Sequence, residues 1–524
     1  MSQTIDPHIL YSQSPFFLDY IEGKQATSQA FAHSIDSLAE LAQRRTSIPS
    51  QQTRSNLCTK LLNYNRNLDA SSNTIANIER LRDSETLCVI GGQQAEFLGG
   101  PLFVLYKIVS IIQTATWLSE RLARPVIPVF WLASEDHDFA EINHTRWIDN
   151  SGALRTIAFD WDAQGAAIEQ LPISDNVHAA FNEARKKIPF FNEADAAVFD
   201  PTADDDFSTW HARTWSRLFA AHGLVIVEPH VLRPLANTFF TRALNEQREV
   251  RESLTRGAQQ LEASGYPVLL DPEQSGGLFT LTENGPRSRI SDLSNATFDA
   301  AITYSADAAL RPLLADSLFP TIANILGPSE LAYHAMLRPL YERWQIPQPL
   351  AVPRQGATLL SNRDSQVLSG FNINLSKALE PAFKPADAAK RMASKTLQSA
   401  FRDARSRTRE TLLPLQDVLR PIDIGLEARW DQTVDQVEHQ LNRLEDRAVR
   451  ADLARRGLSV KSLQALKLRL LPMEKPQERI LSGFSWIAQY GVQWIHDMIA
   501  SGEPRCDNPT RFRHQLIVLE DSHE

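Results

Sequence analysis

The chain has 524 residues, 43% of them hydrophobic and 22% charged, which is the composition of a globular protein long enough for about two to four domains. Its formal net charge of -9 and isoelectric point of about 5.9 exclude a broad basic surface that wraps a nucleic acid. Three cysteines without a C-x-x-C pair argue against a disulfide framework and against a thiolate zinc site.

The same features predict a protein of the cytoplasm. The N-terminus, MSQTIDPHIL, has no basic stretch followed by an apolar one, so it does not resemble a signal peptide. No apolar run reaches the roughly 18 uncharged residues of a transmembrane helix. The low cysteine count also suits a reducing compartment.

Two βαβ units are predicted, after a helical N-terminal segment that ends near residue 85. Short apolar strands that alternate with helices are typical of a parallel sheet covered by helices. Further strands are expected at residues 224–228 and 267–270. The elements of the two units are a strand at 86–90, a helix at 102–122 and a strand at 126–133, then a strand at 321–326, a helix at 328–344 and a strand at 349–352.

The last third of the chain predicts a pair of long helices. Apolar residues there alternate by four and three positions with charged residues between them, which is a heptad seam. An Arg-rich helix is expected at residues 388–413, with Pro414 and Pro421 separating it from the helix that carries the seam. The pattern predicts an antiparallel helical hairpin. The seam consists of Trp430, Val434, Val437, Leu441, Leu444 and Ala448.

The first strand of the first unit ends in the sequence GGQQ. Ligands of open parallel sheets bind at the carboxyl ends of strands, where glycine lets backbone N–H groups approach them closely. The amides of Gln93 and Gln94 offer donors and acceptors to a hydroxyl or amide. Gly92, Gln93 and Gln94 are therefore candidate binding residues, and a tight turn without a ligand is the alternative.

The next strand ends in a cluster of acids and histidine, SEDHD. Acids and a histidine this close to a buried strand could bind a cation or an amine, or act as general acid and base. Asp136, His137 and Asp138 are the candidates for catalysis, and Asn143 extends the same polar surface. A solvated loop is the alternative. The spacing of His137 and His144 does not indicate a zinc site.

The second unit contributes polar residues at the corresponding positions. Gly327 opens a helix after a strand, and Glu330 and Tyr333 lie on the first turns of that helix. Glu330 could also be an ordinary acidic residue at a helix N-terminus. Arg354 follows the next strand, where a cation could hold a carboxylate or a phosphate.

Four segments together resemble one family over nearly the whole chain and in the same order. They are GGQQAEFLGGPLFVLYK, PVFWLASEDHDFAEINH, FPTIANILGPSELAYHAML with PLAVPR, and KPQERILSGFSWIAQYG. The chain thus resembles the bacillithiol synthases, the cysteine-adding enzymes of bacillithiol biosynthesis (BshC). Two positions depart from the family pattern. Glu96 stands in a stretch that is usually small and apolar, and Pro476 stands where leucine is common.

The resemblance implies a Rossmann-like parallel-sheet core, similar to class I aminoacyl-tRNA synthetases, with connecting insertions and a coiled-coil arm that forms a homodimer. It implies amide formation between the carboxylate of L-cysteine and the amine of glucosaminyl-malate. It also implies an ATP or ADP ligand in a second pocket, whose residues stay unknown. The expected segments are residues 1–85 (helical), 86–370 (core, with insertions at about 150–215 and 271–320), 371–465 (arm) and 466–524 (packing back on the core).

For four of the candidate residues and for the glycine segment, we put forward roles as hypotheses. Asp136 and Asp138 would hold an ammonium group, and His137 would deprotonate the attacking amine. Arg354 and the N–H groups of the glycine segment would hold malate carboxylates or the activated carboxyl oxygen. The residues expected to line the cleft are Gly92, Gln93, Gln94, Asp136, His137, Asp138, Asn143, Gly327, Glu330, Tyr333 and Arg354.

Two other functions stay open on the residues alone. Asp136-His137-Asp138 is a D-x-D sequence after a strand, which nucleotide-sugar glycosyltransferases use to hold a divalent ion. A scaffold protein whose working part is the coiled coil is the second alternative, although it leaves the polar strand ends unexplained. Metal-dependent binding of a sugar nucleotide would favour the first, and a protein partner the second.

Overall fold

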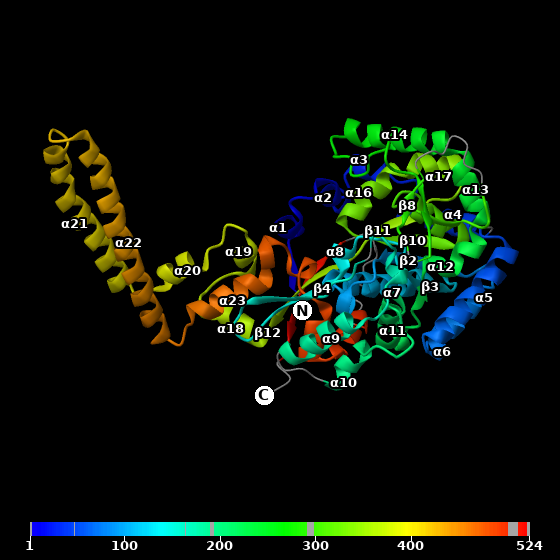
Figure 1. Cartoon of the computed structure of the whole chain (residues 1–524), viewed down its shortest axis with the longest axis horizontal. Coiled ribbons are helices and arrows are strands. Elements are labelled where there is room, and N and C mark those ends of the chain that lie inside the picture. The colour runs from blue at the N-terminus through cyan, green and yellow to red at the C-terminus, as the bar shows by residue number, and fades with distance from the viewer. Residues whose placement is uncertain are drawn as a thin grey trace. The chain divides into compact units, whose positions relative to one another are not determined.

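The computed structural model describes residues 3–46, 48–162, 164–188, 193–283, 285–290, 298–500 and 512–520. The chain forms two compact units. The core unit comprises Met1–Asp149, Arg155–Leu359 and Gln477–Glu524, and the helical unit comprises Asn150–Leu154 and Leu360–Pro476. Figure 1 labels the elements of both.

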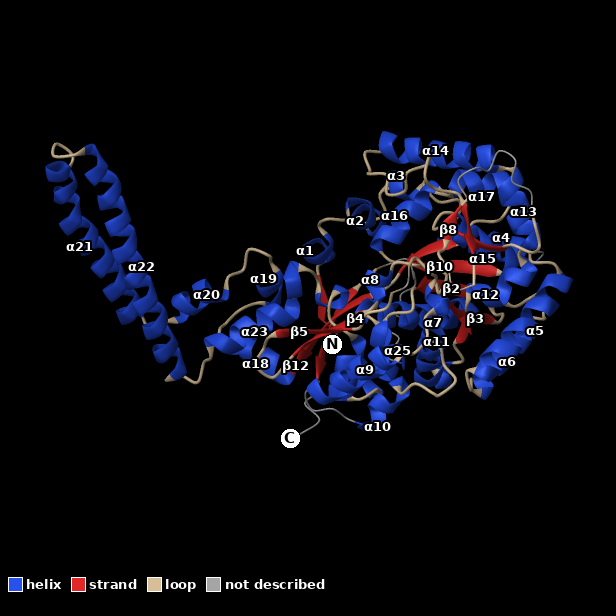
Figure 2. Cartoon of the chain, viewed as in Figure 1, coloured by secondary structure: helices blue, strands red, loops and turns tan. Residues whose placement is uncertain are grey.

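A five-stranded parallel sheet lies at the centre of the core unit (Figure 2). The predicted α/β class with a parallel sheet is confirmed. The strand order is β11-β10-β2-β3-β6, with β2 at Leu87–Gln93, β3 at Val126–Leu132, β6 at Val225–Val227, β10 at Thr321–Leu326 and β11 at Leu350–Pro353.

The strand predicted at residues 267–270 is wrong, because these residues form no strand. Pro267 and Pro272 bracket this short apolar run, and proline cannot donate to a strand ladder. Leu269 is 47% exposed, and only Leu270 of this run packs against the core.

Helix α7 (Leu102–Leu122) packs along β2 and β3. In the part of the chain that the structure describes, it is the one helix long and apolar enough to cross a membrane by length and composition. Most of it is buried inside the protein, which is the environment of a core helix. On the opposite face of the sheet, Leu57 and Leu61 of α5 (Gln51–Asn67) share a buried cluster with Cys88 and Ile90.

The two neighbours of β2 separate at its carboxyl end. β2 pairs with β3 as far as Gln93 and Leu132, but it pairs with β10 only as far as Ile90 and Asn324. The chain runs from β2 to β3 and β6 on one side and returns to β10 and β11 on the other, so this is the topological switch point where open α/β sheets bind ligands. The predicted end of the first strand at residue 90 was wrong, because Gly91, Gly92 and Gln93 belong to β2.

The second βαβ unit contains two helices where one was predicted at residues 328–344. They are α16 (Pro328–Met336) and α17 (Arg338–Trp344), with the break at Leu337. Pro339 in the first turn of α17 lacks an N–H group and therefore cannot continue the hydrogen bonds of α16.

Smaller sheets flank the central one. β1 (Gln3–Ile5) pairs antiparallel with β13 (His514–Leu519), which also joins β12 (Gly356–Ser361), so segments near both ends of the chain meet in one sheet. A second small sheet has the order β8-β7-β9, and β4 and β5 form a third. The bounds of these strands are β4 His144–Ile148, β5 Leu154–Ala158, β7 Leu278–Leu281, β8 Ser288–Arg289 and β9 Thr303–Ala306.

The remaining helices of the core unit surround these sheets. They are α1 Pro7–Tyr11, α2 Pro15–Ile21, α3 Gln25–Ser28, α4 Leu38–Thr46, α6 Ser72–Arg80, α8 Phe139–Ile142, α9 Asp175–Lys187, α10 Glu193–Ala196, α11 Phe207–Leu218, α12 Pro229–Leu232, α13 Asn237–Asn245, α14 Gln247–Ala263, α15 Leu310–Leu318, α24 Gly483–Tyr490 and α25 Gln493–Ala500.

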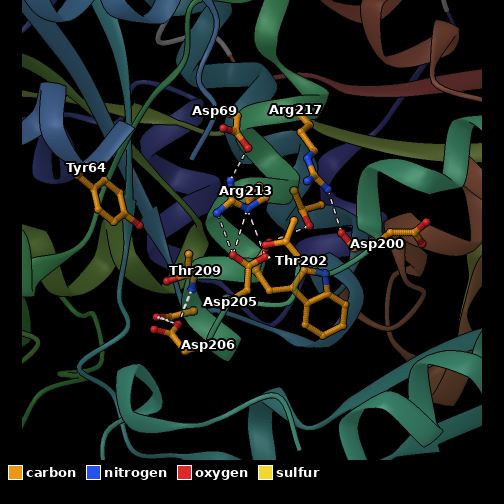
Figure 3. Close-up of polar contacts among 12 residues, drawn as sticks. Tyr64, Asp69, Asp200, Thr202, Asp205, Asp206, Thr209, Arg213 and Arg217 are labelled. Carbon is orange, nitrogen blue, oxygen red and sulfur yellow. Dashed lines mark hydrogen bonds and ion pairs between the residues drawn. The ribbon is translucent and has the colours of Figure 1, made fainter. Parts of the chain in front are cut away.

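A buried arginine organises the segment around α11 (Figure 3). Nε and one terminal nitrogen of Arg213 donate to Asp205, at 2.9–3.2 Å, and the other terminal nitrogen donates to Asp69 at 2.8 Å. Asp205 also accepts the backbone N–H of Thr202. These bonds tie the chain before α11 to the helix itself and to the end of α5.

The helical unit contains the predicted pair of long helices, α21 (Lys395–Leu419) and α22 (Ile424–Ala454), which pack against each other (Figures 1 and 2). The predicted coiled-coil hairpin is confirmed. The prediction that Pro414 ends the first helix was wrong, because α21 runs through Pro414 and ends before Pro421. The other helices of this unit are α18 Asn362–Gly370, α19 Leu375–Leu379, α20 Pro385–Met392 and α23 Val460–Leu470.

Two cysteines are free thiols in the described part of the chain, and both are buried. Burial raises the pKa of the Cys88 thiol to about 12, so Cys88 is a core residue and not a nucleophile. Cys506 lies outside the described residues.

Candidate functional site

Most of the candidate residues lie at the carboxyl edge of the central sheet. Gly92 and Gln93 end β2, and Gln94 follows them. Asp136, His137 and Asp138 follow β3. Gly327 caps α16 after β10, Glu330 and Tyr333 lie on that helix, and Arg354 follows β11.

A cavity of about 60 Å³ opens at the switch point, where β2 and β10 separate. Its polar lining includes predicted and unpredicted residues. Gly92, Glu330 and Tyr333 were predicted, whereas Trp131, Arg311 and His334 were not assigned.

Lys107 of α7 joins the two sides of this opening. Its side chain is 2% exposed, and its ammonium donates to both carboxylate oxygens of Glu330, at 2.7 and 2.8 Å. It also donates to the carbonyl oxygen of Gly92 at 2.7 Å and to Oε1 of Gln93 at 3.2 Å. Burial alone would raise the pKa of Glu330, but the ammonium of Lys107 overrides it and holds that pKa below its ordinary value. Glu330 is therefore a charged wall of the cavity with its own counter-ion.

The other polar walls are neutral or cationic at neutral pH. Burial lowers the pKa of His334 to about 4 and raises the pKa of Tyr333 to about 12. Burial disfavours the charged form of Arg311 too, but Tyr333, Asp136 and Glu330 raise its pKa above the ordinary value. Arg311 is thus the cation of the cavity, and it makes no ion pair within 4 Å among residues that the structure describes.

The turn after β3 is held by Gln94 and by its own backbone. Gln94 Nε2 donates to Oδ2 of Asp136 at 2.7 Å, and the N–H of His137 donates to Oδ1 at 2.8 Å. Burial would raise the pKa of Asp136, but these two bonds and Arg287, at 3.9 Å, lower it. The side chains of His137 and Asp138 are exposed. The turn thus presents an imidazole beside an ionised carboxylate, with Nδ1 of His137 3.6 Å from Asp136.

Glu135 of the same turn points inward and was not predicted as an anchor. It is 7% exposed, and its carboxylate accepts hydrogen bonds from Ser305 at 2.8 Å and from Nε of Arg233 at 2.9 Å. These two hydrogen bonds hold the base of the turn in place, while His137 and Asp138 lie exposed at the surface.

Asn143 is engaged in local structure. Its Nδ2 donates to the carbonyl oxygen of Phe159 at 3.1 Å, and its own carbonyl oxygen accepts the N–H of Phe159 at 3.0 Å. Asn143 does not line the cavity. Its binding role stays a prediction.

Arg354 has a buried partner that the sequence did not reveal. Its two terminal nitrogens donate to Glu478, at 2.7 and 3.1 Å, and the two side chains are 2% and 0% exposed. Burial would raise the pKa of Glu478, but Arg354 lowers it to about 2. Tyr11 donates to the same carboxylate at 2.8 Å and contacts Nδ1 of His514 at 2.9 Å. The predicted role of Arg354 as the cation for a substrate carboxylate stays a prediction. Its buried ion pair with Glu478 gives Arg354 a structural role.

The glycines of this edge serve close packing. A Cβ atom on Gly91 would lie 2.8 Å from Cδ1 of Ile111, and one on Gly92 would lie 2.9 Å from the carbonyl oxygen of Trp131. The N–H of Gly327 donates to Glu330 at 2.6 Å, so the first donor of α16 is already used. The cavity of about 60 Å³ is much smaller than the roughly 300–1,000 Å³ of a typical ligand pocket, so its residues do not fit ATP or ADP. The predicted second nucleotide pocket stays a prediction without assigned residues.

Glu96, a departure from the family pattern, is buried beside this edge. Gln93 Nε2 donates to its carboxyl group at 3.2 Å. Burial raises the pKa of Glu96 to about 8, so the group is mostly protonated at neutral pH. Gln93 therefore links a neutral acid on one side to Lys107 on the other.

The sequence contains a signal for one of the missed residues. Lys107 is a charged residue in the otherwise apolar helical sequence LFVLYKIVSII, and a buried lysine needs a partner. Arg311 and His334 lie on helices without a comparable pattern around them.

For the D-x-D interpretation, no group of three His, Cys, Asp or Glu side chains that could hold a metal ion occurs within the described ranges.

Two family models match the chain in consecutive segments. The model described as "Bacillithiol biosynthesis BshC, N-terminal Rossmann-like domain" matches residues 4–304 and 291–355. The model described as "Bacillithiol biosynthesis BshC, C-terminal coiled-coil domain" matches residues 357–519.

Curated proteins named "Putative cysteine ligase BshC" are similar over almost their full length. The protein of Bacillus cytotoxicus is 29% identical over 510 residues, which cover 91% of this chain and 94% of that protein. The protein of Koribacter versatilis is 29% identical over 508 residues, covering 92% and 94%. The protein of Geobacillus sp. is 27% identical over 542 residues, covering 97% and 99%.

A solved structure described as a "putative arginyl t-RNA synthetase" from Campylobacter jejuni covers 79% of this chain and 92% of its own. Its TM-score of 0.22 and sequence identity of 12% carry no argument about this chain. The predicted likeness to class I aminoacyl-tRNA synthetases stays a prediction.

Proposed function

The chain belongs to the bacillithiol biosynthesis BshC family, and from this premise we propose that it is a cysteine ligase that adds L-cysteine to the amine of glucosaminyl-malate. The names of the curated relatives support the ligase class, and their similarity extends over more than nine tenths of the chain. The family membership favours this function over a glycosyltransferase or a scaffold. A cytoplasmic location is part of the proposal, supported by the low cysteine count.

The proposed reaction forms a C–N bond between the carboxyl carbon of cysteine and the amine nitrogen of the glucosamine. The two substrates together lose the elements of one water, with the oxygen coming from the carboxylate and the two hydrogens from the ammonium nitrogen. A carboxylate does not lose its oxygen to an amine unaided. A nucleoside triphosphate is the usual activator of a carboxylate, and it would supply that activation here if it is bound. The residues of this chain would bind the substrates, orient them and move the proton of the amine.

The observation that carries the proposal is the arrangement at the switch point. A cavity with a cationic arginine lies beside a turn that presents an exposed histidine and two carboxylates. Asp136 and Asp138 would hold the ammonium group of a substrate, and His137 would accept the proton of the attacking amine. An ammonium beside ionised Asp136 is favoured electrostatically, because this carboxylate keeps a lowered pKa.

The test uses purified protein with L-cysteine, glucosaminyl-malate and MgATP, and mass spectrometry of the thiol product. We expect product from the wild type and a loss of at least about 100-fold in turnover for His137→Ala, since general-base catalysis contributes on that order. Asp138→Asn should also lower turnover, because it removes a carboxylate that would hold and position the substrate ammonium. The exposed His178 of α9 offers a matched control, and His178→Ala should keep wild-type turnover.

The outcomes of this test distinguish the cysteine ligase activity from the proposed roles of single residues. Wild-type turnover by His137→Ala would remove the proposed base and leave the ligase. If the wild type forms no product with all three compounds, alone or with a cell extract that supplies a further protein component, the ligase proposal fails.

A homodimer through the coiled-coil hairpin is also part of the proposal. The hairpin exposes several large apolar side chains, and Leu444 of the predicted seam is 57% exposed. Leu444→Glu should shift the mass measured by light scattering from two chains to one without a change in helix content. The others in this set are Leu413, Leu415, Val418 and Ile422.

A further inference from the structure

The cavity between β2 and β10 is lined by an indole N–H without a hydrogen-bond partner and, among the described residues, by a guanidinium without an ion pair. Trp131 lies in its wall and is 3% exposed, and the indole N–H of Trp131 has no hydrogen-bond partner. Leaving such a donor buried and unpaired costs about 1–3 kcal/mol. Arg311 lies in the same wall and is half-buried. Its side chain is hydrogen-bonded to Tyr333, but it has no ion pair within 4 Å among the described residues. A buried cation without a counter-ion is also costly.

The carboxylates nearest to Arg311 are already occupied by other donors. Glu330 accepts two bonds from Lys107 and one from the N–H of Gly327. Asp136 accepts bonds from Gln94 and from the N–H of His137. Neither carboxylate therefore neutralises Arg311 through a direct ion pair, and the charge of the cavity wall stays positive at this point.

The remaining polar walls suit an acceptor as well. His334 and Tyr333 are uncharged at neutral pH, so neither adds a negative charge. The cavity volume of about 60 Å³ is room for a few atoms, since one water needs roughly 10–15 Å³ by the same measure. A small planar anion fits these dimensions, and a nucleotide does not.

We infer that this cavity is a carboxylate-binding pocket, in which the guanidinium of Arg311 and the indole N–H of Trp131 hold a carboxylate of the substrate. Guanidinium geometry matches a carboxylate, and the indole offers one further donor. The inference rests on the proposed function for the source of the carboxylate, which is either L-cysteine or the malate part of glucosaminyl-malate. It assigns to Arg311 the role that the sequence suggested for Arg354.

The test measures binding by isothermal titration of the full-length protein with L-cysteine and, separately, with L-malate. L-cysteine methyl ester serves as the matched probe without a carboxylate. We expect one of the two acids to bind, and the methyl ester to bind at least about 10-fold more weakly if that acid is L-cysteine. The acid that binds identifies the source of the carboxylate.

Two variants remove one donor each. Arg311→Met should weaken binding about 10- to 100-fold, because a hydrogen bond to a charged group is lost, and Arg311→Lys should restore part of it. Trp131→Phe keeps the aromatic ring but loses the N–H, and should weaken binding about 2- to 10-fold. Trp147 offers a matched control, since its indole N–H is also buried without a partner but does not line the cavity. Trp147→Phe should bind like the wild type.

Two outcomes overturn the inference. One is that neither acid binds the wild type at millimolar concentration. The other is that Arg311→Met and Trp131→Phe bind like the wild type while thermal unfolding shows them folded. If the wild type binds an acid through these two residues but forms no thiol product, the pocket stands and the ligase proposal fails.

Discussion

Two buried ion pairs of the core unit, Arg213–Asp205 and Lys107–Glu330, differ in what lies beside them. The guanidinium of Arg213 is used completely, by Asp205 and by Asp69 (Figure 3). The ammonium of Lys107 is also used completely, but its partner Glu330 is 24% exposed and lines a cavity. The first pair joins segments of the fold, and the second also forms one wall of the candidate site.

The difference teaches that burial and ion pairing do not mark a functional site by themselves. Both pairs place charged side chains in the protein interior, and removing one partner of either pair would cost stability. Only Lys107–Glu330 lies at the switch point, where β2 and β10 separate. We therefore expect the two pairs to contribute similarly to stability and very differently to activity.

The largest effect is expected for Lys107→Met. It leaves the carboxylate of Glu330 without its counter-ion and frees the end of β2, so we expect the free energy of unfolding to fall by about 3–5 kcal/mol. Turnover of the folded protein should fall at least about 100-fold, because a displaced cavity wall misplaces the substrate. The double variant with Glu330→Gln should recover much of the stability in urea unfolding but none of the turnover. A single variant with wild-type turnover would contradict this account of the site.

Arg213→Met tests the other pair. It leaves Asp205 buried without a counter-ion, and the free energy of unfolding should fall by a similar ~3–5 kcal/mol. The protein that remains folded should keep the KM and kcat of the wild type. These constants are measured at a temperature where circular dichroism shows the variant folded. An increase in KM would mean that this pair also shapes the site, and the comparison would fail.

A smaller effect, set by pH, is expected for Glu96→Gln. The pKa of Glu96 is about 8 in the folded protein and about 4.3 in an unfolded chain. A raised carboxyl pKa contributes stability that is complete below pH ~4.3 and is lost as pH rises through about 8. The glutamine variant lacks this loss, so its free energy of unfolding should gain on the order of 4 kcal/mol relative to wild type between pH 4.5 and 8.5. Urea unfolding at the two pH values measures it, and a difference that is the same at both would contradict the buried neutral acid.

The smallest effect is expected for an exposed pair. Glu79 and Arg82 contact at 2.8 Å near the end of α6, with side chains 46% and 41% exposed. Water screens such a pair, so Glu79→Gln should change the free energy of unfolding by only ~0.3 kcal/mol. A loss above 1 kcal/mol, or a change in KM, would mean that burial does not decide the weight of an ion pair in this protein.

The fold was predictable because its signals are local. The apolar runs of β3 and β10 stand out in the sequence, and the heptad seam around Leu441 predicts a helix pair without further information. The errors are also local in origin. Gly91 and Gly92 look like a turn, but pairing with β3 keeps them in β2, and α21 tolerates Pro414 although the sequence predicts a break there.

The candidate site was predictable only as an edge of the sheet. The residues after β2 and β3 stand out because polar groups follow buried strands directly. The partners do not stand out, because they come from distant positions. Glu330 meets a lysine 223 residues away, and Arg354 meets an acid 124 residues away. Such pairs depend on tertiary packing, and no local pattern around Arg311 predicts its place in the cavity wall.

The most direct measurement of the central claim is thiol profiling, by mass spectrometry with a thiol-trapping reagent, of cells that lack this gene. We expect loss of bacillithiol with accumulation of glucosaminyl-malate, and recovery when the wild-type gene is returned but not when the Lys107→Met gene is returned. Unchanged bacillithiol in cells without a second copy of the gene would contradict the proposed cysteine ligase.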